Sequence, residues 1–543
     1  MRLNLIFLLF LFSMVCRGQG YNLIPYPQVL EPGQGQFVVN AQLRVVASPG
    51  FEREGVMLRR LLQKALGRAL TGSGREILLE HDVGITRPEA YTLVITPRRI
   101  EIKAGGSDGI FHGIETIRQL LPAAAERGKV GDPPRLPAES RKVSDSLALP
   151  AVRIEDYPAY SWRGMHLDVS RHFFSIDYLR RFIDRMALYK MNKLHLHLSD
   201  DQGWRVEIKH YPLLTEAGAW RAFNNQDSAC MRRAADDPDF AIDSSHLIRR
   251  NGRVLYGGFY TQEQLRALVA YAGERHIDII PEIDMPGHMM AAINSYPFLT
   301  CNGENKWGEL FTKPICACNE TTYTFAENVF SEIMDIFPSP YIHIGGDEVD
   351  RSDWAKSAAC RALMERMGIK DLPGLQSYFI SRMEKFFRSK GRELVGWDEI
   401  IEGPISPDAL VMYWRGWVPG APLKAARNGN KVVMAPGEPL YFDRPADQYD
   451  LSNVYHFNPV GKISDTALAA KIIGAQACLW SEQLPNEKRC DYMYMPRMTA
   501  LAEALWTARP EGWDTYVHRL GAHFPRMDAM GINYRLPDLP DLL

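Results

Sequence analysis

The stretch Tyr341-Ile342-His343-Ile344-Gly345-Gly346-Asp347-Glu348 joins a short apolar run to two glycines and then to two adjacent carboxylates. The apolar run predicts a buried strand. The two glycines allow the backbone to turn sharply and a ligand to come close. Two neighbouring acids in apolar surroundings do not share one pKa, so one can stay ionised while the other keeps its proton. The stretch therefore predicts a strand with acid–base chemistry at its end.

Similar apolar runs recur after about residue 156, and segments of helical spacing lie between them, as at Leu179, Phe182, Ile183 and Met186. Eight strand-like units over about 350 residues match the number and size of a (β/α)8 barrel, or TIM barrel. A doubly wound parallel sheet is the alternative that the pattern leaves open. The eight runs are Gly164–Val169, Lys193–Leu198, Ile277–Ile283, Tyr341–Ile344, Glu393–Trp397, Leu410–Trp414, Lys431–Ala435 and Ile473–Trp480.

We divide the chain into a signal peptide (residues 1–18), an accessory domain (residues 19–155) and a barrel domain (residues 156–543) with a short C-terminal tail. The accessory domain mixes short strand-like runs with two helical patterns, which predicts a small α+β domain. The segment Gly131–Pro150 is rich in Pro, Ser and charge and is predicted to be an exposed loop or boundary. The predicted strands are Gln36–Asn40, Leu43–Ala47, Glu76–Leu79, Tyr91–Ile95 and Ile100–Ala104, and the predicted helices are Gly55–Leu66 and His112–Leu121.

The N-terminus has the features of a secretory signal, because Arg2 precedes the apolar run Leu5–Phe12 and small residues follow. Cys16 leaves a lipid anchor open, although Ser13-Met14-Val15 is a poor lipobox. No other segment has about 18 uninterrupted apolar residues, so no integral membrane span is expected. We expect a secreted or periplasmic protein, held at the outer surface if Cys16 carries a lipid.

Composition and cysteine spacing exclude several kinds of partner and site. Hydrophobic residues are 46% and charged residues 24%, as in ordinary folded proteins. The net charge of −2 provides no field that would attract nucleic acid. Cys301, Cys316 and Cys318 cluster in a loop-like stretch and can supply one disulfide in an oxidising compartment. Cys316-Ala317-Cys318 lacks a matching second pair, so no zinc site is expected.

Each predicted barrel strand ends in acidic, polar or aromatic residues, and in a barrel these ends meet at the rim where chemistry takes place. Aromatic rings pack against the apolar C–H face of a pyranose, while carboxylates and a guanidinium hydrogen-bond its hydroxyls. The rim therefore predicts a sugar-binding site. Its residues are Asp168, Arg171, Ser199–Asp201, Glu282–His288, Asp347, Glu348, Trp397–Glu399, Tyr413, Trp414, Tyr441–Asp443 and Trp480–Glu482.

The adjacency of Asp347 and Glu348 limits the mechanism. Ordinary retaining glycosidases hold two carboxyls about 5 Å apart on opposite sides of the bond. Neighbours in sequence have diverging side chains and rarely bracket one carbon in that way. The 2-acetamido group of the substrate is therefore a candidate nucleophile, which is a known exception to the two-carboxylate rule.

His195 and His197 alternate with leucines, so both imidazoles are expected to face the barrel interior. They either bind a metal, as in barrel amidohydrolases, or are satisfied by hydrogen bonds. We favour hydrogen bonds, because His288 and the acids do not complete a recognisable ligand spacing. Asp200, Asp284 and His288 are either loop structure or groups that tune the proton of a catalytic acid.

Together these motifs resemble those of the family 20 glycoside hydrolases, the β-N-acetylhexosaminidases, over nearly all of the mature chain. Leu23–Pro27 resembles the start of the family's accessory domain, and Gly109–Leu121 resembles its closing helix. The polar stretch Arg221–Arg253 looks like an insertion that lines the rim on the leaving-group side. The matches in the barrel are Asp168–Phe173, His195–Trp204, Pro281–His288 and His343–Glu348.

The resemblance implies a role for each residue of the rim. Glu348 would be the general acid and later the base that activates water. Asp347 would orient the acetamido group and stabilise the oxazolinium charge, and Tyr441 would donate to the acetamido carbonyl oxygen. The other implied groups are Trp397, Trp414 and Trp480 as walls of the sugar site, Arg171, Asp443 and Glu482 as ligands of ring hydroxyls, and Asp200, Asp284 and His288 as surrounding residues that tune the acids.

We therefore expect a retaining exo-β-N-acetylhexosaminidase that uses no metal or other cofactor. Its partner would be a glycan with a terminal GlcNAc or GalNAc, not nucleic acid, and the sequence leaves a homodimer open. The alternatives are a lacto-N-biosidase of the same family and a metal-dependent amidohydrolase that uses His195, His197 and His288. A third, a carbohydrate-binding protein without activity, is disfavoured by the intact Asp347–Glu348 pair.

Overall fold

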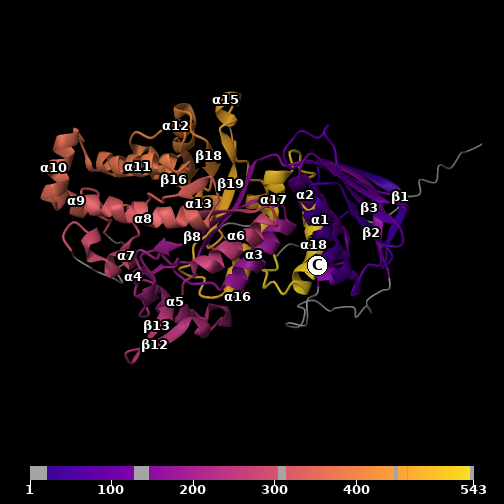
Figure 1. Cartoon of the computed structure of the whole chain (residues 1–543), viewed down its shortest axis with the longest axis horizontal. Helices are drawn as coiled ribbons and strands as arrows, with labels where there is room; N and C mark the ends of the chain where they lie inside the picture. The colour runs from indigo at the N-terminus through magenta and orange to yellow at the C-terminus, as the bar shows by residue number, and fades with distance from the viewer. Residues whose placement is uncertain (1–20, 127–145, 304–312, 446–450, 462, 538–543) are drawn as a thin grey trace, which may run out of the picture.

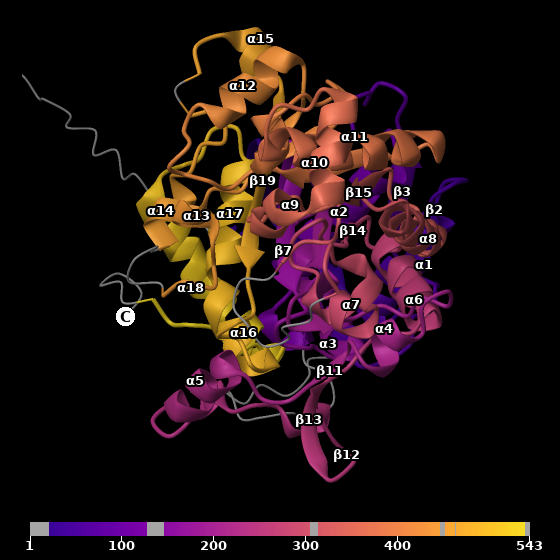
Figure 2. The same cartoon turned by 90° about the vertical axis from the view of Figure 1, so that its left-hand side faces the viewer.

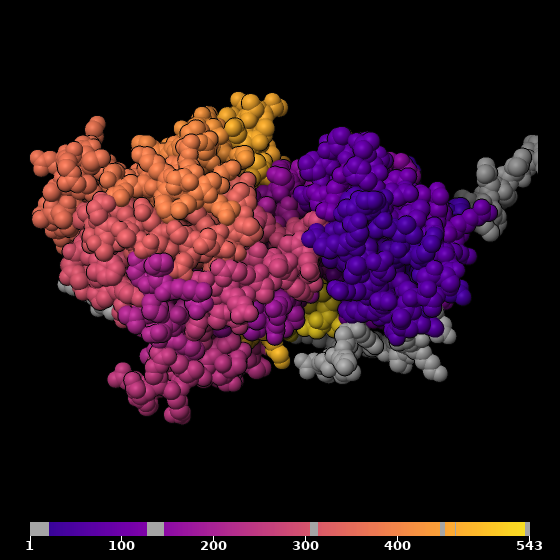
Figure 3. All heavy atoms as spheres, in the orientation of Figure 1, coloured from indigo at the N-terminus to yellow at the C-terminus, as the bar shows by residue number. Residues whose placement is uncertain are grey.

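A computed structural model of the chain describes residues 21–126, 146–303, 313–445, 451–461 and 463–537. An N-terminal domain lies at one end of the molecule and a larger barrel domain at the other (Figures 1 and 3). The predicted signal peptide with Cys16, and most of the predicted loop Gly131–Pro150, lie outside the described residues. Within the described ranges, no helix has both the length and the apolar character that a membrane crossing requires.

Eight parallel strands close into a barrel, and each overlaps one of the predicted runs. Closure through parallel pairing on both sides of every strand confirms the (β/α)8 prediction and excludes a doubly wound sheet, whose edges stay open. In order around the barrel the strands are β14 (Asp278–Glu282), β15 (Tyr341–His343), β16 (Glu393–Trp397), β17 (Leu410–Tyr413), β18 (Val432–Met434), β19 (Ile472–Leu479), β7 (Trp162–Asp168) and β8 (Lys193–His197).

Helices surround the barrel and bury their apolar faces against it. In α3 (Ile176–Leu188), Ser175 caps the N-terminus by accepting a hydrogen bond from the Tyr178 N–H, and the predicted apolar residues Leu179 and Phe182 are buried. The other helices of this domain are α4 (Leu213–Glu216), α5 (Asn225–Arg233), α6 (Gln262–Gly273), α7 (Met290–Ser295), α8 (Glu320–Ile336), α9 (Ser352–Lys356), α10 (Ala358–Met367), α11 (Leu372–Ser389), α12 (Ala421–Asn428), α13 (Gly437–Leu440), α14 (Leu451–Tyr455), α15 (Thr466–Ala469), α16 (Glu487–Tyr494), α17 (Arg497–Trp506) and α18 (Trp513–Ala529).

The N-terminal domain is a six-stranded sheet covered by two helices, α1 (Glu52–Leu66) and α2 (Ser107–Leu120). Apolar side chains from these helices and from the sheet form a core separate from that of the barrel. The strands, in order across the sheet, are β1 (Val29–Val39), β6 (Leu147–Asp156), β4 (Tyr91–Ile95), β5 (Ile100–Ala104), β3 (Glu76–His81) and β2 (Arg44–Ala47).

Strand β6 corrects one prediction, because Leu147–Pro150 is part of an inner strand and not an exposed loop. Proline cannot donate to a β-ladder, so Pro150 argues against a strand on sequence grounds. In the sheet, Pro150 lies opposite Gln36 of β1, next to an irregularity in the β1 register that begins at Pro32. The ladder is already interrupted there, and this explains why the missing N–H is tolerated.

The end of the chain holds the two domains together. From α18, Arg519 Nη1 donates to the Leu23 carbonyl oxygen (2.6 Å) and Arg526 Nη2 donates to the Gln119 carbonyl oxygen (2.9 Å). Both arginines are buried. The accessory domain is thereby fixed against the barrel.

The predicted insertion Arg221–Arg253 projects from the barrel domain (Figure 2). It contains α5 and β12 (Leu247–Arg250), and it ends at the first residue of β13 (Arg253–Gly257), which pairs with β12 as an antiparallel hairpin. Strand β11 (Trp220–Arg221) pairs with β13, so backbone pairing joins the beginning of the insertion to its end. A second short pair, β9 (Ser199–Asp200) with β10 (Gly203–Trp204), follows β8.

Candidate active site

The turn after β15 brings the two adjacent acids to the end of the barrel. Gly345 and Gly346 have φ angles of +72° and +94°, a region that favours glycine. The Gly346 N–H donates to Asp284 Oδ1 (3.2 Å), and Gln376 Nε2 donates to the Gly346 carbonyl oxygen (2.7 Å). A Cβ added at Gly345 would lie 1.8 Å from Asp284 Oδ1. This contact makes the glycine necessary for the approach of the β14 and β15 loops.

Gly345→Ala should therefore destabilise the protein more than Gly368→Ala. Gly368 has a similar φ of +66°, so each substitution carries the left-handed cost of about 1–2 kcal/mol. Nothing lies within 4 Å of a Cβ at Gly368, whereas Gly345 adds the clash with Asp284. Thermal unfolding would be measured for both variants. Equal Tm shifts in the two variants would contradict the steric argument.

Both adjacent carboxyl groups approach one imidazole. His288 Nε2 lies 3.8 Å from Asp347 Oδ2 and 3.5 Å from Glu348 Oε2. The Asp347 side chain is buried, whereas that of Glu348 is 41% exposed. The turn thus brings the two acids to one point and gives them different solvation.

Asp284 and Asp347 form a buried pair of carboxyl groups. Burial raises the pKa of Asp284 well above its ordinary value, and the nearby charge of Asp347 adds to this effect. Burial also raises the pKa of Asp347, while its hydrogen bond with Asp284 acts in the opposite direction. The proton of the pair therefore resides on Asp284, and Asp347 is the member held as the anion.

Asp200 connects His288 to the interior of the barrel. Its Oδ1 is 3.3 Å from His288 Nδ1, and its Oδ2 is 2.8 Å from both Arg171 Nη2 and His197 Nε2. Burial opposes a charge on His288, but the carboxylate of Asp200 raises the pKa of this imidazole well above its ordinary value. The hydrogen bond from His288 in turn lowers the pKa of Glu348. The proton thus lies on His288, and Glu348 is a carboxylate, because the hydrogen bond and the charge of the imidazolium outweigh the partial burial of Glu348.

Three tryptophans and one tyrosine from neighbouring strand ends form an aromatic wall. Trp414 and Tyr441 are nearly parallel, with ring centroids 6.2 Å apart and an interplanar angle of 10°. The Trp480 ring lies 6.1 Å from that of Tyr441 and 5.7 Å from that of Trp397. The predicted aromatic residues are therefore brought together on one side of the rim.

Arg171, Asp443 and Glu482 supply polar groups beside this wall. The Arg171 guanidinium lies 5.0 Å from the centre of the Trp480 ring. Burial, assisted by the charge of Glu482, raises the pKa of Asp443 to about 7. Burial also raises the pKa of Glu482, although Arg171 opposes this. Among the described residues, Asp443 Oδ1 has no hydrogen-bond partner although it is buried, so it is available to a ligand.

Comparison with known families agrees with this geometry. Residues 160–509 match the model of the glycosyl hydrolase family 20 catalytic domain, and residues 20–157 match that of glycosyl hydrolase family 20, domain 2. The chain belongs to glycosyl hydrolase family 20. The resemblance stated from the motifs is thereby confirmed, and the chain is placed among glycoside hydrolases.

Two curated relatives in the family are a β-hexosaminidase of Porphyromonas gingivalis and a β-N-acetylhexosaminidase of Cellulomonas fimi. The first is 35% identical over 96% of this chain but only 65% of its own length, and the second is 31% identical over 94% and 95%. A Vibrio harveyi exo-β-N-acetylglucosaminidase, solved in complex with N-acetylglucosamine, is 34% identical with a TM-score of 0.81 over 96% of this chain and 79% of that chain. A Streptomyces coelicolor β-N-acetylhexosaminidase is 32% identical with a TM-score of 0.78 over 96% and 98%.

Glu282 has a structural role in this family 20 barrel that the sequence analysis did not assign. Its Oε1 accepts a hydrogen bond from Trp397 Nε1 (2.9 Å). Its carboxyl oxygens also lie 3.0 Å from His195 Nε2, 2.5 Å from His197 Nδ1 and 3.0 Å from His343 Nδ1. Hydrogen bonds satisfy both ring nitrogens of His197, which contact Glu282 and Asp200. His195 is hydrogen-bonded to Gln476 through Nδ1, but its Nε2 has no hydrogen-bond partner among the described residues, so the expectation holds for His197 and only in part for His195. The signal in the sequence was an acid inside an apolar strand, next to strands that carry histidines.

The histidines proposed for a metal amidohydrolase have separate partners. His195 and His197 hold Glu282, whereas His288 contacts Asp200 and the two acids of the turn. The His–Glu groups around Glu282 have the atom types of metal ligands, but Glu282 Oε1 already accepts a hydrogen bond from Trp397 Nε1 and Oε2 is hydrogen-bonded with His197 Nδ1. This arrangement favours a hydrogen-bonded core over a metal centre.

Glu399 belongs to the predicted rim, but the sequence analysis assigned it no individual role. It accepts a hydrogen bond from Trp414 Nε1 (2.9 Å) and so fixes the orientation of that ring. Burial, together with the charges of Asp347 and Asp398, raises the pKa of Glu399 to about 8. A strand-end acid next to a tryptophan was the only signal in the sequence.

Proposed function

We propose that this chain is a retaining, exo-acting β-N-acetylhexosaminidase that uses the acetamido group of its substrate as the nucleophile. The observation that carries the proposal is the pair Asp347–Glu348, in which both carboxyls approach His288 and one is held as an anion by Asp284. Neighbours in sequence have diverging side chains and rarely flank one glycosidic bond from opposite faces, which favours the acetamido group as the nucleophile. The relatives named above, including the one solved with N-acetylglucosamine, support the substrate class.

In the first step Asp347 accepts a hydrogen bond from the acetamido N–H and turns the carbonyl oxygen toward C1. That oxygen bonds to C1 while the bond to the leaving oxygen breaks, and Glu348 gives its proton to the leaving oxygen. Tyr441 donates to the acetamido oxygen, and Asp347 stabilises the charge of the oxazolinium ion. Water, deprotonated by Glu348, then opens this ion at C1, and the two inversions retain the configuration.

The remaining rim residues bind the terminal sugar. Trp397, Trp414 and Trp480 enclose the acetamide and stack on the apolar face of the ring. Hydroxyl groups of the ring bind to polar groups next to this wall, which gives selectivity for one terminal sugar. These polar groups are Arg171, Asp443 and Glu482.

The proton for the leaving group comes from the pair formed by His288 and Glu348. Before a sugar binds, this pair carries one proton, held on the imidazole. A bound sugar displaces water from Glu348, and the loss of water disfavours an ion pair relative to a neutral pair. The proton then moves to Glu348, and Asp200 holds the imidazole in position for its return.

His288→Gln should therefore shift the alkaline limb of the pH profile of kcat/KM to lower pH. In the native pair the proton is retained up to the raised pKa of His288. Without the imidazole the proton must sit on Glu348 alone, for which a carboxyl pKa of about 4.3 is the starting value. Activity on a poor leaving group should then decline above roughly pH 5. His210 is exposed, so His210→Gln is the control and should leave the pH profile unchanged. A native pH profile in His288→Gln would contradict a proton shared between His288 and Glu348.

Four measurements on the native enzyme test the proposed function. The first sugar released from an aryl β-GlcNAc should be the β-anomer by NMR, which identifies retention. A thiazoline mimic of the cyclised intermediate should inhibit competitively, and hydrolysis should persist in a chelator.

Release of a disaccharide from defined glycans would instead identify a lacto-N-biosidase. An absence of thiazoline inhibition would remove the acetamido nucleophile, and loss of activity in the chelator would favour a metal enzyme.

Secretion, lipid attachment at Cys16 and a homodimer remain predictions. Cell fractionation and mass spectrometry of the N-terminal peptide would test the first two. Light scattering of the purified protein would test the third.

A further inference from the structure

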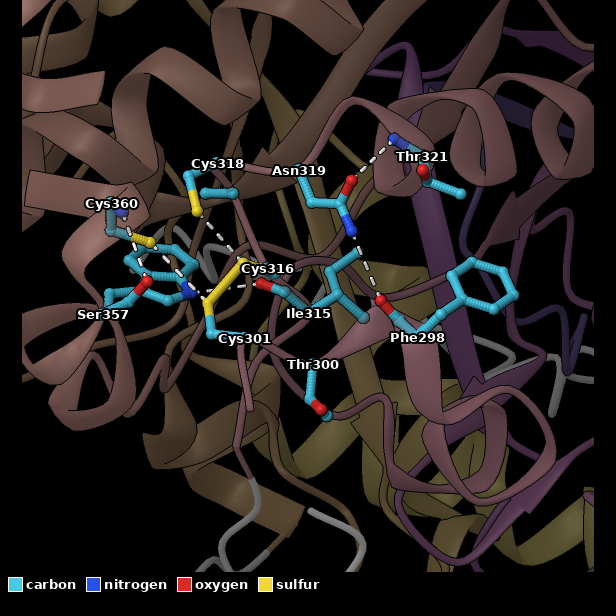
Figure 4. The surroundings of a disulfide bond; sticks show 12 residues. Phe298, Thr300, Cys301, Ile315, Cys316, Cys318, Asn319, Thr321, Ser357 and Cys360 are labelled. Atoms are coloured by element: carbon cyan, nitrogen blue, oxygen red, sulfur yellow. Dashed lines mark hydrogen bonds between the residues drawn. A yellow bond between two sulfur atoms is a disulfide. The ribbon is translucent and has the colours of Figure 1, made fainter. Parts of the chain in front are cut away.

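Four cysteines from three segments of the chain meet outside the candidate active site (Figure 4). Cys301 follows the short helix η4 (Pro297–Leu299), Cys316 and Cys318 precede α8, and Cys360 lies in the first turn of α10. Their four Sγ atoms all lie within 4.8 Å of one another. The sequence grouped the first three cysteines, and the fold adds Cys360.

Two of the four are already joined. Cys301 and Cys316 form a disulfide, so the cluster supplies the one disulfide that the sequence allowed, with the pairing that the sequence left open. Cys318 and Cys360 are thiols in the structure. Cys318 Sγ is 3.2 Å from Cys316 Sγ, and Cys360 Sγ is 3.6 Å from Cys301 Sγ, so the thiol pair lies directly beside the disulfide.

The two thiols differ in exposure and in pKa, as an attacking thiol and its neighbour do in disulfide formation. Cys318 is partly exposed, whereas Cys360 is buried. Their mutual hydrogen bond lowers the pKa of Cys318 to about 7 and raises that of Cys360. A reachable thiol with a low pKa is the one that attacks an oxidant, and a buried neighbour completes the reaction.

We infer that Cys318 and Cys360 form a second disulfide beside Cys301–Cys316. This second disulfide links the segment before α8 to α10. The oxidant is a disulfide of the compartment, small or protein-borne. The Cys318 thiolate attacks one oxidant sulfur and expels the other as a thiolate. The Cys360 thiolate then attacks the Cys318 sulfur of the mixed disulfide and expels the second. The two protons of the cysteines end on the two oxidant thiols, so atoms and electrons balance.

A four-thiolate zinc site is the competing occupant of this cluster. Zinc would need four thiolates arranged as a tetrahedron, and two of the sulfurs here are bonded to each other. The second disulfide would close a segment of the chain that contains β15 and the turn with Asp347 and Glu348. It would thereby restrict the unfolded chain around the candidate site and stabilise the fold.

The first experiment labels thiols in the native, non-reduced chain after unfolding, followed by proteolysis and mass spectrometry. The expected result is that Cys301, Cys316, Cys318 and Cys360 carry no label, whereas Cys230, Cys478 and Cys490 are labelled and serve as internal controls. Label on Cys318 and Cys360 would overturn the inference. One equivalent of bound zinc, with all four cysteines labelled after chelation, would overturn it as well.

Single variants assign the pairing. Cys318→Ala should expose Cys360 to label and Cys360→Ala should expose Cys318, with Cys301 and Cys316 protected in both. Label on Cys301 in the Cys360→Ala chain would indicate exchanged pairs and contradict the inference.

Thermal unfolding gives a readout independent of labelling. Each single variant should lower Tm by several degrees, and the double variant should lower it no further, because each change removes the same bond. The control Cys490→Ala, at a buried free cysteine in α16, should add its own shift to either variant. Additive shifts for Cys318→Ala and Cys360→Ala would contradict a shared bond. None of these outcomes depends on the proposed glycosidase activity.

Discussion

Glu348→Gln should lower kcat/KM by about 10²–10⁴-fold for substrates whose leaving group is a second sugar. Glutamine has nearly the same shape as glutamate, but it cannot pass a proton to the leaving oxygen or take one from water. A nitrophenolate leaves without a proton, so an activated aryl β-GlcNAc should lose much less in the first step. A series of aryl glycosides should therefore show a steeper dependence on leaving-group pKa in the variant than in the native enzyme.

Glu402→Gln is the matched control for this change. Glu402 lies at the end of η5 (Asp398–Glu402), after β16, and its side chain is partly exposed like that of Glu348. Its partners are Arg351 and Arg415, so its removal should affect stability more than the leaving-group dependence. A Glu348→Gln enzyme that lost the same factor with every leaving group would exclude Glu348 as the acid.

The barrel could be predicted because parallel strands that are buried on both faces appear as continuous apolar runs. Tyr341–Ile344 and Glu393–Trp397 show this, and β16 has the bounds that its run predicts. The inner strand β6 could not be predicted in the same way. Its Pro150 is tolerated only because β1 is irregular at the opposite position, and that fact belongs to the pairing of two distant segments.

The members of the candidate site could be predicted from strand ends, but their charges could not. Asp347, Glu348 and His288 meet because the carboxyl ends of parallel strands share one edge. The proton, however, lies on His288 and Asp284, because burial and distance decide its place, and neither can be read from sequence. Cys360 was not grouped with the other cysteines of its cluster because its distance from them in the fold cannot be read from the sequence either.

Asp347→Asn should reduce kcat on the order of 10²–10³-fold even with an activated aryl leaving group. In the proposed mechanism the carboxylate stabilises positive charge that develops as the acetamido oxygen attacks C1, and a good leaving group does not replace that stabilisation. Asparagine also offers an N–H where the substrate presents its own N–H. The loss should therefore be independent of leaving-group pKa, in contrast to that of Glu348→Gln, and the same glycoside series measures both.

Asp284→Asn, compared with Asp347→Asn, tests which of the two carboxyl groups carries the charge. Because burial keeps Asp284 protonated, an amide can replace its donor toward Asp347 and still accept from the Gly346 N–H. Asp284→Asn should then keep most of the activity between about pH 5 and pH 7, while Asp284→Ala, which removes the donor, should lose more. Equal losses in Asp284→Asn and Asp347→Asn would show that both carboxyls must be charged, and the assignment of the anion to Asp347 alone would be wrong.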